Sequence, residues 1–188
     1  MIILASQSPY RKKLLEKTKY TFTCVKPEVD EELLKNNFKG SPDKLCSYLA
    51  YKKALSISKT HKEALVIGSD QSLLLEGKHL GKGKTFKGAF EQLKVCSEKT
   101  AELITAVAVI KDKTESHFEV ITKLKFKKLT DQDITWYLNK DKPYDCAGSF
   151  KMEESGAVLF EHAMCIDPTA IEGLPLMRLS LEIDKIYP

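Results

Sequence analysis

A hydroxyl-rich segment near the start of the chain carries residue types that bind phosphate groups. Ser6 and Ser8 precede Pro9, and Arg11 and Lys12 follow shortly after. A serine followed by a proline is typical of the first turn of a helix, where backbone N–H groups and the helix dipole favour an anion. Arg11 adds a planar donor that can form two hydrogen bonds to a phosphate. The segment therefore indicates either a phosphate site or an ordinary capped helix whose cations lie in solvent.

Two carboxylates form a second candidate group. Asp70 ends the apolar run 65–69, so we expect it at the carboxyl end of a buried strand, where open α/β sheets bind ligands. Glu31 lies in the acidic segment 27–32, which we expect to be a turn. Mg²⁺ is commonly held by one or two carboxylates together with substrate phosphates. The alternatives are a turn-capping role for Asp70 and a surface position for Glu31.

Two lysines are candidates for neutralising phosphate charge. Lys53 lies on the apolar side of an expected helix, and Lys82 stands between two glycines. Each is equally consistent with a surface lysine whose stem covers apolar side chains. The adjoining residues 83–85 read Gly-Lys-Thr, as at the end of a P-loop, but that motif requires glycine at the position of Lys78. We therefore predict a Gly/Lys loop near an anion rather than a P-loop.

Hydrophobic periodicity predicts elements that place these residues. The expected strands span residues 2–5, 20–25, 65–70, 102–110, 117–129 and 158–160. The expected helices span residues 9–18, 42–57, 86–96 and 130–139, and two more begin near Pro168 and Pro175. Parallel-type crossovers combined with a central hairpin indicate an α/β fold with a mixed sheet.

Composition bounds the class of protein. The 188 residues carry a formal net charge of +4, and residues 1–60 alone carry 12 Lys and Arg against 6 Asp and Glu. This length suits one domain, or two small lobes that share a core. No apolar run reaches the roughly 18 residues of a membrane span, and residues 1–5 are too short for a signal peptide. We therefore expect a cytoplasmic protein, and without basic runs we expect no stable complex with nucleic acid.

The cysteines and histidines show no ligand spacing. The five cysteines are odd in number, widely spaced and without a C-x-x-C pair, so we expect free thiols that fill the core in a reducing compartment. The four histidines are isolated along the chain, and we expect them at the surface. Neither residue type predicts a structural metal site.

Seven segments together resemble the Maf family, in the family's order and from about residue 2 to residue 176. They are Leu4-Ala5-Ser6-x-Ser8-Pro9-x-Arg11, Pro27-Glu28-Val29-Asp30-Glu31, Leu49-Ala50-x-x-Lys53-Ala54, Ile67-Gly68-Ser69-Asp70-Gln71, Gly81-Lys82, Ala147-Gly148-Ser149-Phe150 and Gly173-Leu174-Pro175-Leu176. The resemblance implies one domain over residues 1–188, with two lobes around a mixed β-sheet flanked by helices and a cleft between the lobes, similar to the ITPase fold. It also implies a homodimer.

The activity implied by the resemblance is that of a nucleoside triphosphate pyrophosphatase, which releases a nucleoside monophosphate and pyrophosphate. Asp70 would accept the proton of the attacking water. Glu31 and Asp70 would hold Mg²⁺ or Mn²⁺. The residues implied to hold the phosphates are Ser6, Ser8, Arg11, Lys12, Lys53 and Lys82.

Three further positions are implied to face the base. Gln71 and Glu153 resemble the branch of the family that acts on 7-methyl-GTP, and Tyr10 would stack on the cationic ring. One alternative is action on dTTP or UTP. Another is a nucleotide- or nucleic-acid-binding regulator of septum formation without turnover, although a pure polyanion binder has no use for paired carboxylates. Departures from the family pattern occur at Lys12, at residues 83–84 and at residues 154–155.

Overall fold

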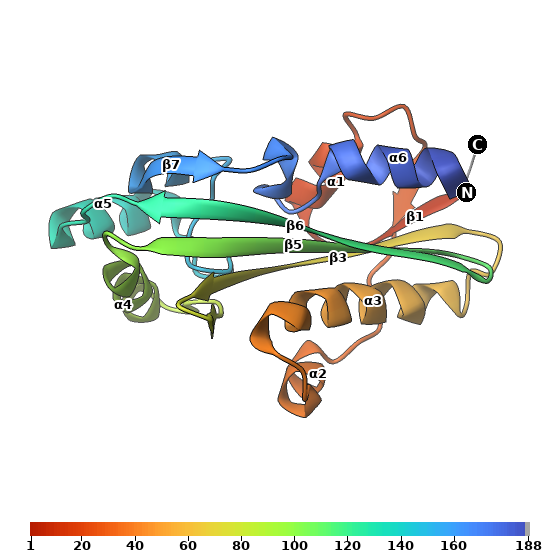
Figure 1. Ribbon diagram of the computed structural model, residues 1–188, viewed down its shortest axis with the longest axis horizontal. Coiled ribbons are helices and arrows are strands. Elements are labelled where there is room, and N and C mark those ends of the chain that lie inside the picture. The colour runs from red at the N-terminus through yellow and green to blue at the C-terminus, as the bar shows by residue number, and fades with distance from the viewer. Residues whose placement is uncertain (187–188) are drawn as a thin grey trace. The chain divides into compact units, whose positions relative to one another are not determined.

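The computed structural model describes residues 1–186, which form one mixed sheet with helices on it (Figure 1). The strand order is β2-β1-β3-β5-β6-β7, and β4 pairs with β3 off this path. The strands are β1 (Ile2–Ala5), β2 (Phe22–Cys24), β3 (Leu65–Leu75), β4 (Lys78–Leu80), β5 (Thr100–Lys111), β6 (Thr114–Phe126) and β7 (Phe160–Met164). The α/β fold with a mixed sheet predicted from the sequence is confirmed.

Six α-helices lie between or after these strands in the described chain. They are α1 (Pro9–Leu15), α2 (Glu31–Asn37), α3 (Leu45–Ser58), α4 (Phe86–Cys96), α5 (Asp131–Asp141) and α6 (Leu176–Ile186). The chain divides into two compact units. Of the described residues, the first unit comprises 1–71, 105–120 and 167–186, and the second comprises 72–104 and 121–166.

In the first unit, β1 pairs in parallel with β2 on one side and with β3 on the other. Both faces of these strands are covered. Leu14 and Leu15 of α1 and Leu179 and Ile183 of α6 pack on one face, and α3 packs on the other through Ala54 and Ile57. Figure 1 shows α1 and α6 on the opposite side of the strands from α3. Such two-sided burial requires strands that are apolar throughout, as β1 and the first half of β3 are.

Side-chain caps begin the two short helices that carry candidate residues. Ser8 accepts a hydrogen bond from the backbone N–H of Arg11 and begins α1, as the Ser-Pro pair predicts. Asp30 accepts from the N–H of Leu33 and begins α2. The prediction of a turn over residues 27–32 was therefore wrong for residues 31 and 32, which are helical. Asp30 is the N-cap of α2, and Glu31 and Glu32 lie in its first turn, where negative charge stabilises a helix.

In the second unit, two helices cover the end of the sheet. Helix α4 packs against α5, and α5 begins with the capping box of Thr130 and Asp133 that the sequence predicts. Beneath them, the rings of Phe126, Phe150 and Phe160 contact one another. These contacts fix the segment that follows Ala147-Gly148 against β6 and β7.

Several predicted strands differ from the structure in their bounds. The strand predicted at residues 20–25 spans Phe22–Cys24, and the strand predicted at residues 117–129 spans Thr114–Phe126. Strand β3 continues to Leu75 because residues 72–75 are buried and residues 73–75 pair with β4. Asp70 therefore lies within a strand, not at the predicted carboxyl end. The last strand, predicted at residues 158–160, begins only at Phe160, because residues 156–159 form a 3₁₀ turn.

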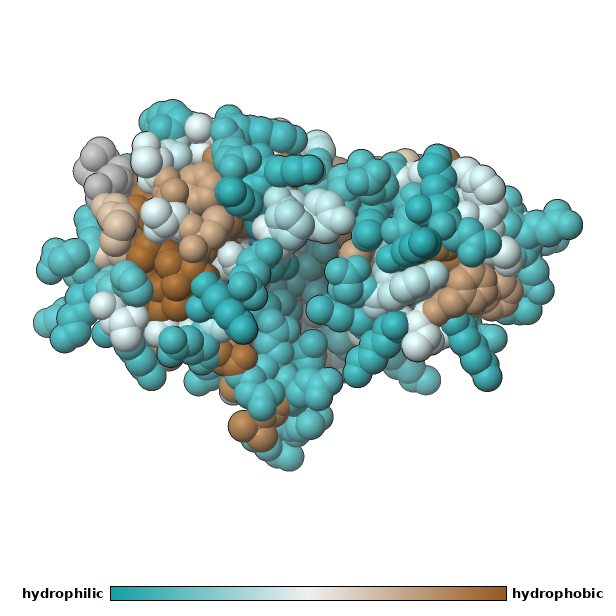
Figure 2. Space-filling model, turned by 180° about the vertical axis from the view of Figure 1, so that it is seen from behind, coloured by the Kyte–Doolittle hydropathy of each residue, from teal (hydrophilic) through white to brown (hydrophobic). Residues whose placement is uncertain are grey.

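Figure 2 shows the surface on one face of the molecule. Seen from behind, it is hydrophilic over most of its area, with hydrophobic atoms gathered in a few patches (Figure 2). Over the described residues no helix has both the length and the hydropathy that crossing a membrane requires.

Candidate active site

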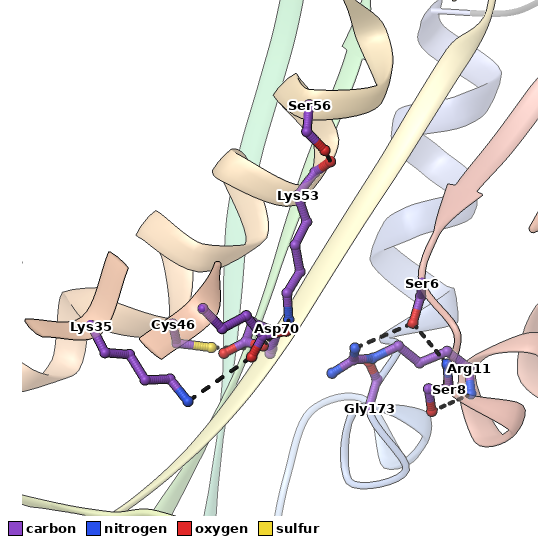
Figure 3. Close-up of polar contacts among 10 residues, drawn as sticks. Ser6, Ser8, Arg11, Lys35, Cys46, Lys53, Ser56, Asp70 and Gly173 are labelled. Atoms are coloured by element: carbon purple, nitrogen blue, oxygen red, sulfur yellow. Dashed lines mark hydrogen bonds and ion pairs between the residues drawn. The ribbon is translucent and has the colours of Figure 1, made fainter. Parts of the chain in front are cut away.

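Lys53 joins two carboxylates of the first unit. Its Nζ lies 2.5 Å from Oδ1 of Asp70 and 3.0 Å from Oε1 of Glu31. The Lys53 side chain is 6% exposed and that of Asp70 is 12% exposed, whereas Glu31 is partly exposed at the start of α2. One buried ammonium thus brings together two carboxylates that lie far apart in the sequence. Figure 3 shows the Lys53 side chain extending from its helix to Asp70. Lys35 adds a weaker contact, 4.0 Å from the Glu31 carboxylate.

A close helix–strand approach makes the Lys53–Asp70 contact possible. A Cβ on Gly68 would collide with the carbonyl oxygen of Ala50 and the backbone nitrogen of Ala54, so glycine lets α3 lie directly on β3. The Cys46 thiol of α3 also donates to the carbonyl oxygen of Asp70, at 3.1 Å. Side chains of helix α3 therefore contact both the carboxylate and the backbone carbonyl of Asp70.

Arg11 is oriented by backbone and hydroxyl oxygens. Its Nε donates to the carbonyl oxygen of Gly173 at 3.0 Å, and its Nη1 lies 3.5 Å from Oγ of Ser6. The hydroxyl of Ser69 donates to the same Gly173 carbonyl at 2.9 Å. Figure 3 shows Arg11 between Ser6 and Gly173. Since Nε is the atom used on Gly173, the guanidinium retains donors on its two terminal nitrogens that suit a phosphate.

The loop before α6 is built to present the Gly173 carbonyl. The buried Asp167 carboxylate accepts from the N–H and hydroxyl of Thr169 and from the N–H of Met177. Gly173 has φ +106°, a conformation that side chains disfavour. The Gly-Leu-Pro-Leu segment of the family resemblance thus acts in this structure through a backbone oxygen.

Strand register connects these two groups. Strand β1 pairs with β3 as far as Ala5 beside Gly68, so Ser69 and Asp70 lie just past the last β1 pair. Successive residues of a strand point to opposite faces, which sends Ser69 toward Arg11 and Gly173 and Asp70 toward Lys53. Ser69 is thereby connected to Arg11 through the shared Gly173 carbonyl, and its neighbour Asp70 is connected to Lys53 and through it to Glu31, so the two groups are joined at adjacent residues of β3.

Other predicted residues of the first unit have different surroundings. The Oγ of Ser8 is the N-cap of α1. Lys12 is 58% exposed and pairs with Glu16 at 3.7 Å on the same helix. Tyr10 is half-buried on α1. The predicted contacts of these residues with phosphate or base stay predictions.

Gln71 is held by the protein itself. Its Nε2 lies 3.0 Å from each of three acceptors, the Thr105 hydroxyl and the carbonyl oxygens of Ala170 and Ile171. The Thr105 hydroxyl also donates to the Ala170 carbonyl. Gln71 thus ties the loop before α6 to β3 and β5 through its amide nitrogen. Its predicted hydrogen bond to a base edge stays a prediction.

In the second unit, Lys82 lies on a loop that pairs with the Ala-Gly-Ser-Phe segment. Lys82 and Ala147 form an isolated antiparallel bridge, and the N–H of Gly148 donates to the Gly81 carbonyl at 3.2 Å. The Lys82 side chain is exposed. The next residues do not form a P-loop, as predicted. The hydroxyl of Thr85 accepts from the N–H of Gly88 and caps α4.

Glu153 lies in the second unit on a turn anchored to α5. The Tyr137 hydroxyl accepts from the N–H of Lys151 at 2.8 Å, and the Asp141 carboxylate accepts from the N–H of Ser155. The Glu153 side chain is exposed. The added length at residues 154–155 is thus taken up by a turn that the helix stabilises.

Two cysteines outside these clusters have raised pKa values. Burial raises the pKa of Cys96 to about 12, and burial together with Asp145 raises that of Cys146 to about 12. Such thiols are protonated and poorly nucleophilic at neutral pH. All five cysteines are free thiols. Within residues 1–186, no three His, Cys, Asp or Glu side chains group in a way that could hold a metal ion by themselves.

Sequence reasoning missed three residues that support these groups. Ser69 lies inside a quoted segment, and the strand alternation around Asp70 could have suggested it. Cys46 and Gln92 stand in no motif, and no pattern in the sequence marks them.

Comparisons with known proteins give consistent relatives. A protein 42% identical over 181 residues, from Colwellia psychrerythraea, is named 7-methyl-GTP pyrophosphatase, and the match covers 95% of this chain and 88% of that one. Proteins of the same name from Pseudoalteromonas atlantica and Aromatoleum aromaticum are each 41% identical. The match to the Pseudoalteromonas protein covers 98% of this chain and 94% of that protein. The match to the Aromatoleum protein covers 95% of this chain and 92% of that protein.

A solved structure, the nucleoside-triphosphatase / dITP/XTP pyrophosphatase of Mycobacterium abscessus, is 17% identical with a TM-score of 0.40. The match covers 66% of this chain and 73% of the chain in the solved structure. The family model described as Maf-like protein matches residues 1–186. This match over nearly the whole chain, with relatives at about 40% identity, shows that the protein belongs to the Maf family.

Proposed function

We propose that the protein is a nucleoside triphosphate pyrophosphatase that acts on 7-methyl-GTP. The observation that carries this proposal is that Lys53 joins Asp70 and Glu31, while Ser69, the residue before Asp70, shares the Gly173 carbonyl with Arg11. Hydrolysis of a triphosphate requires both a base and fixed cations, and these two groups supply them. The relatives named 7-methyl-GTP pyrophosphatase support the choice of substrate.

In the proposed reaction, water attacks the α-phosphorus. A new oxygen–phosphorus bond forms, the bond from the α-phosphorus to the oxygen bridging to the β-phosphorus breaks, and pyrophosphate leaves with that oxygen. Asp70 accepts the proton of the water, and the ion pair with Lys53 orients the carboxylate for this step. Arg11 binds the phosphate oxygens with the terminal nitrogens that Gly173 leaves available. In the second unit, the exposed Lys82 is proposed to bind the pyrophosphate end.

The residues present suit a divalent cation. Glu31 and Asp70 both direct an oxygen at one ammonium, so a single cation already bridges them. Hard carboxylate oxygens are ligands for Mg²⁺ or Mn²⁺, which take their remaining ligands from substrate phosphates and water. Glu31 and Asp70 would hold such an ion, and when bound it would supply charge neutralisation for the phosphate oxygens.

Selectivity for the methylated base is assigned to Tyr10, Gln71 and Glu153. Methylation at N7 gives guanine a positive charge, which an aromatic face and a carboxylate favour. We propose stacking by Tyr10, a base-edge contact by the Gln71 amide oxygen and charge balance by Glu153. Residues 1–188 are proposed to act as one domain and to form a cytoplasmic homodimer.

The test is a screen of pyrophosphate release with Mg²⁺ over 7-methyl-GTP, GTP, UTP and dTTP. The proposal expects pyrophosphate rather than orthophosphate, with 7-methyl-GTP turned over fastest. Glu153→Gln should reduce the preference for 7-methyl-GTP over the other triphosphates and leave the rate of hydrolysis of those triphosphates unchanged. Glu154→Gln, on the same turn, is the control and should leave the preference unchanged. Faster turnover of dTTP or UTP would contradict the substrate, and binding without any release of pyrophosphate would contradict the enzyme.

A further inference from the structure

The Gly81–Gly83 loop of the second unit, which carries Lys82, is held by more than its own backbone pairing. Residue Gln92 of α4 extends its side-chain amide to this loop, and its Nε2 donates to the Gly81 carbonyl at 3.1 Å. That carbonyl also accepts from the N–H of Gly148. A carbonyl with two donors is fixed in direction as well as in position.

The other end of the same amide reaches the Ala-Gly-Ser-Phe segment. Oε1 of Gln92 accepts from the Ser149 hydroxyl at 2.6 Å. Gln92 therefore uses its donor on one side of the Lys82–Ala147 bridge and its acceptor on the other. An amide satisfied at both ends is specific for glutamine, because a carboxylate offers no donor and an aliphatic chain offers neither group.

The Ser149 backbone is strained, so its position depends on such contacts. Ser149 is fully buried with φ 58°, and Gly148 before it has φ 68°. A non-glycine residue in this region costs free energy and persists where its surroundings fix it. A Cβ on Gly83 would meet the Ser149 hydroxyl, so the two segments are also in direct contact.

We propose that Gln92 is a positioning residue that holds Lys82 in the orientation that binds phosphate. This inference rests on the proposed function, in which Lys82 contacts the pyrophosphate end of the substrate. Gln92 acts through the Gly81 carbonyl and Ser149 and does not touch the substrate. It extends the site to α4, an element that carries no other candidate residue.

The first test uses Gln92→Met, which keeps the length of the side chain and removes both hydrogen bonds. The expected result is a rise of about 5- to 10-fold in KM for the triphosphate, of the size a lost hydrogen bond produces. Glu91→Met, at the exposed neighbouring position on α4, is the matched control and leaves KM unchanged. An unchanged KM in Gln92→Met, or an equal rise in both variants, would overturn the proposal.

A double-mutant cycle separates positioning from general stability. If Gln92 acts through Lys82, adding Gln92→Met to Lys82→Met changes KM no further, whereas two independent effects multiply. Multiplied effects would overturn the role of Gln92 and leave the proposed function standing. Absence of pyrophosphate release by the unmodified protein would instead overturn the proposed function itself.

Hydrogen exchange gives a readout that does not depend on turnover. In Gln92→Met the N–H of Gly148, which donates to the Gly81 carbonyl, should exchange several-fold faster than in the unmodified protein and in Glu91→Met. The capping box of α5 should exchange as before. Equal exchange at Gly148 in all three proteins would show that Gln92 does not hold the loop.

Discussion

The two units hold their candidate residues by different means. In the first unit, the buried ammonium of Lys53 holds the largely buried carboxylate of Asp70 and the partly exposed carboxylate of Glu31. In the second unit, Lys82 and Glu153 are exposed. Backbone pairing with Ala147 holds the Lys82 loop, and side chains of α5 accept hydrogen bonds from backbone N–H groups of the Glu153 turn. The lysine charge of the first unit, on Lys53, is therefore buried, whereas the charges of Lys82 and Glu153 in the second unit are exposed on loops.

This difference decides what a substitution reports. Removing one member of a buried ion pair leaves its partner charged and without compensation in a medium of low dielectric constant, so stability and activity fall together. Removing an exposed charge changes the interaction with the substrate and leaves the fold nearly unaffected. The lysines of the two units, Lys53 and Lys82, give the sharpest comparison.

The largest effect is expected for Asp70→Asn. The amide is nearly isosteric but cannot accept the proton, so kcat should fall by about 100-fold or more, in the range of general base catalysis. Steady-state pyrophosphate release measures this, and circular dichroism checks the fold. Asp112→Asn, in the exposed turn between β5 and β6, is the control. Near-normal turnover by Asp70→Asn would remove Asp70 from the mechanism.

Lys53→Met should destabilise the protein. It removes the cation between two carboxylates, and breaking a buried pair in this way costs about 2–4 kcal/mol when one partner is partly exposed. Urea unfolding measures this loss. Lys82→Met is the matched substitution in the second unit and should unfold within about 0.5 kcal/mol of the unmodified protein. Equal losses in the two variants would contradict the contrast between the units.

Arg11→Lys tests the bidentate donor. Lysine keeps the charge but cannot reach the Gly173 carbonyl and a phosphate together, so KM should rise by about 10-fold. Ser69→Ala removes the second donor to the same carbonyl and should have a smaller effect of the same kind. Lys13→Arg, an exposed change on α1, serves as control. A KM unaffected by Arg11→Lys would show that the charge alone suffices.

The smallest effect concerns acid stability in the second unit. Hydrogen bonds from the Thr130 hydroxyl and N–H lower the pKa of Asp133. Because the pKa of Asp133 is lower in the folded than in the unfolded protein, its carboxylate stabilises the fold at pH values above the unfolded-state pKa of about 3.9. This contribution is lost as the pH falls through the pKa of the folded state. Asp133→Asn should therefore lower Tm at neutral pH, with the difference from the unmodified protein shrinking in acid. A Tm difference between the two proteins that does not change with pH would show that the charge of Asp133 does not contribute to the cap.

Local signals in the sequence predicted much of the fold. The Ser8-Pro9 and Thr130–Asp133 caps and the apolar strands depend on neighbouring residues, and the structure confirms them. The helix α2 was missed because its seven residues bury no side chain and so carry no apolar period. The end of β3 was misplaced because pairing with β4, not local sequence, extends it to Leu75.

The sequence by itself determined the family, the order of the elements and the candidates Arg11, Glu31, Lys53 and Asp70, because these lie in ordered motifs of recognisable spacing. Only the tertiary structure decided which of them meet. The Lys53 ammonium joins both carboxylates because Gly68 lets α3 lie on β3. Gln92 bridges two loops although no pattern marks it. Contacts between residues distant in sequence depend on how elements pack, and spacing along the chain carries no information about that packing.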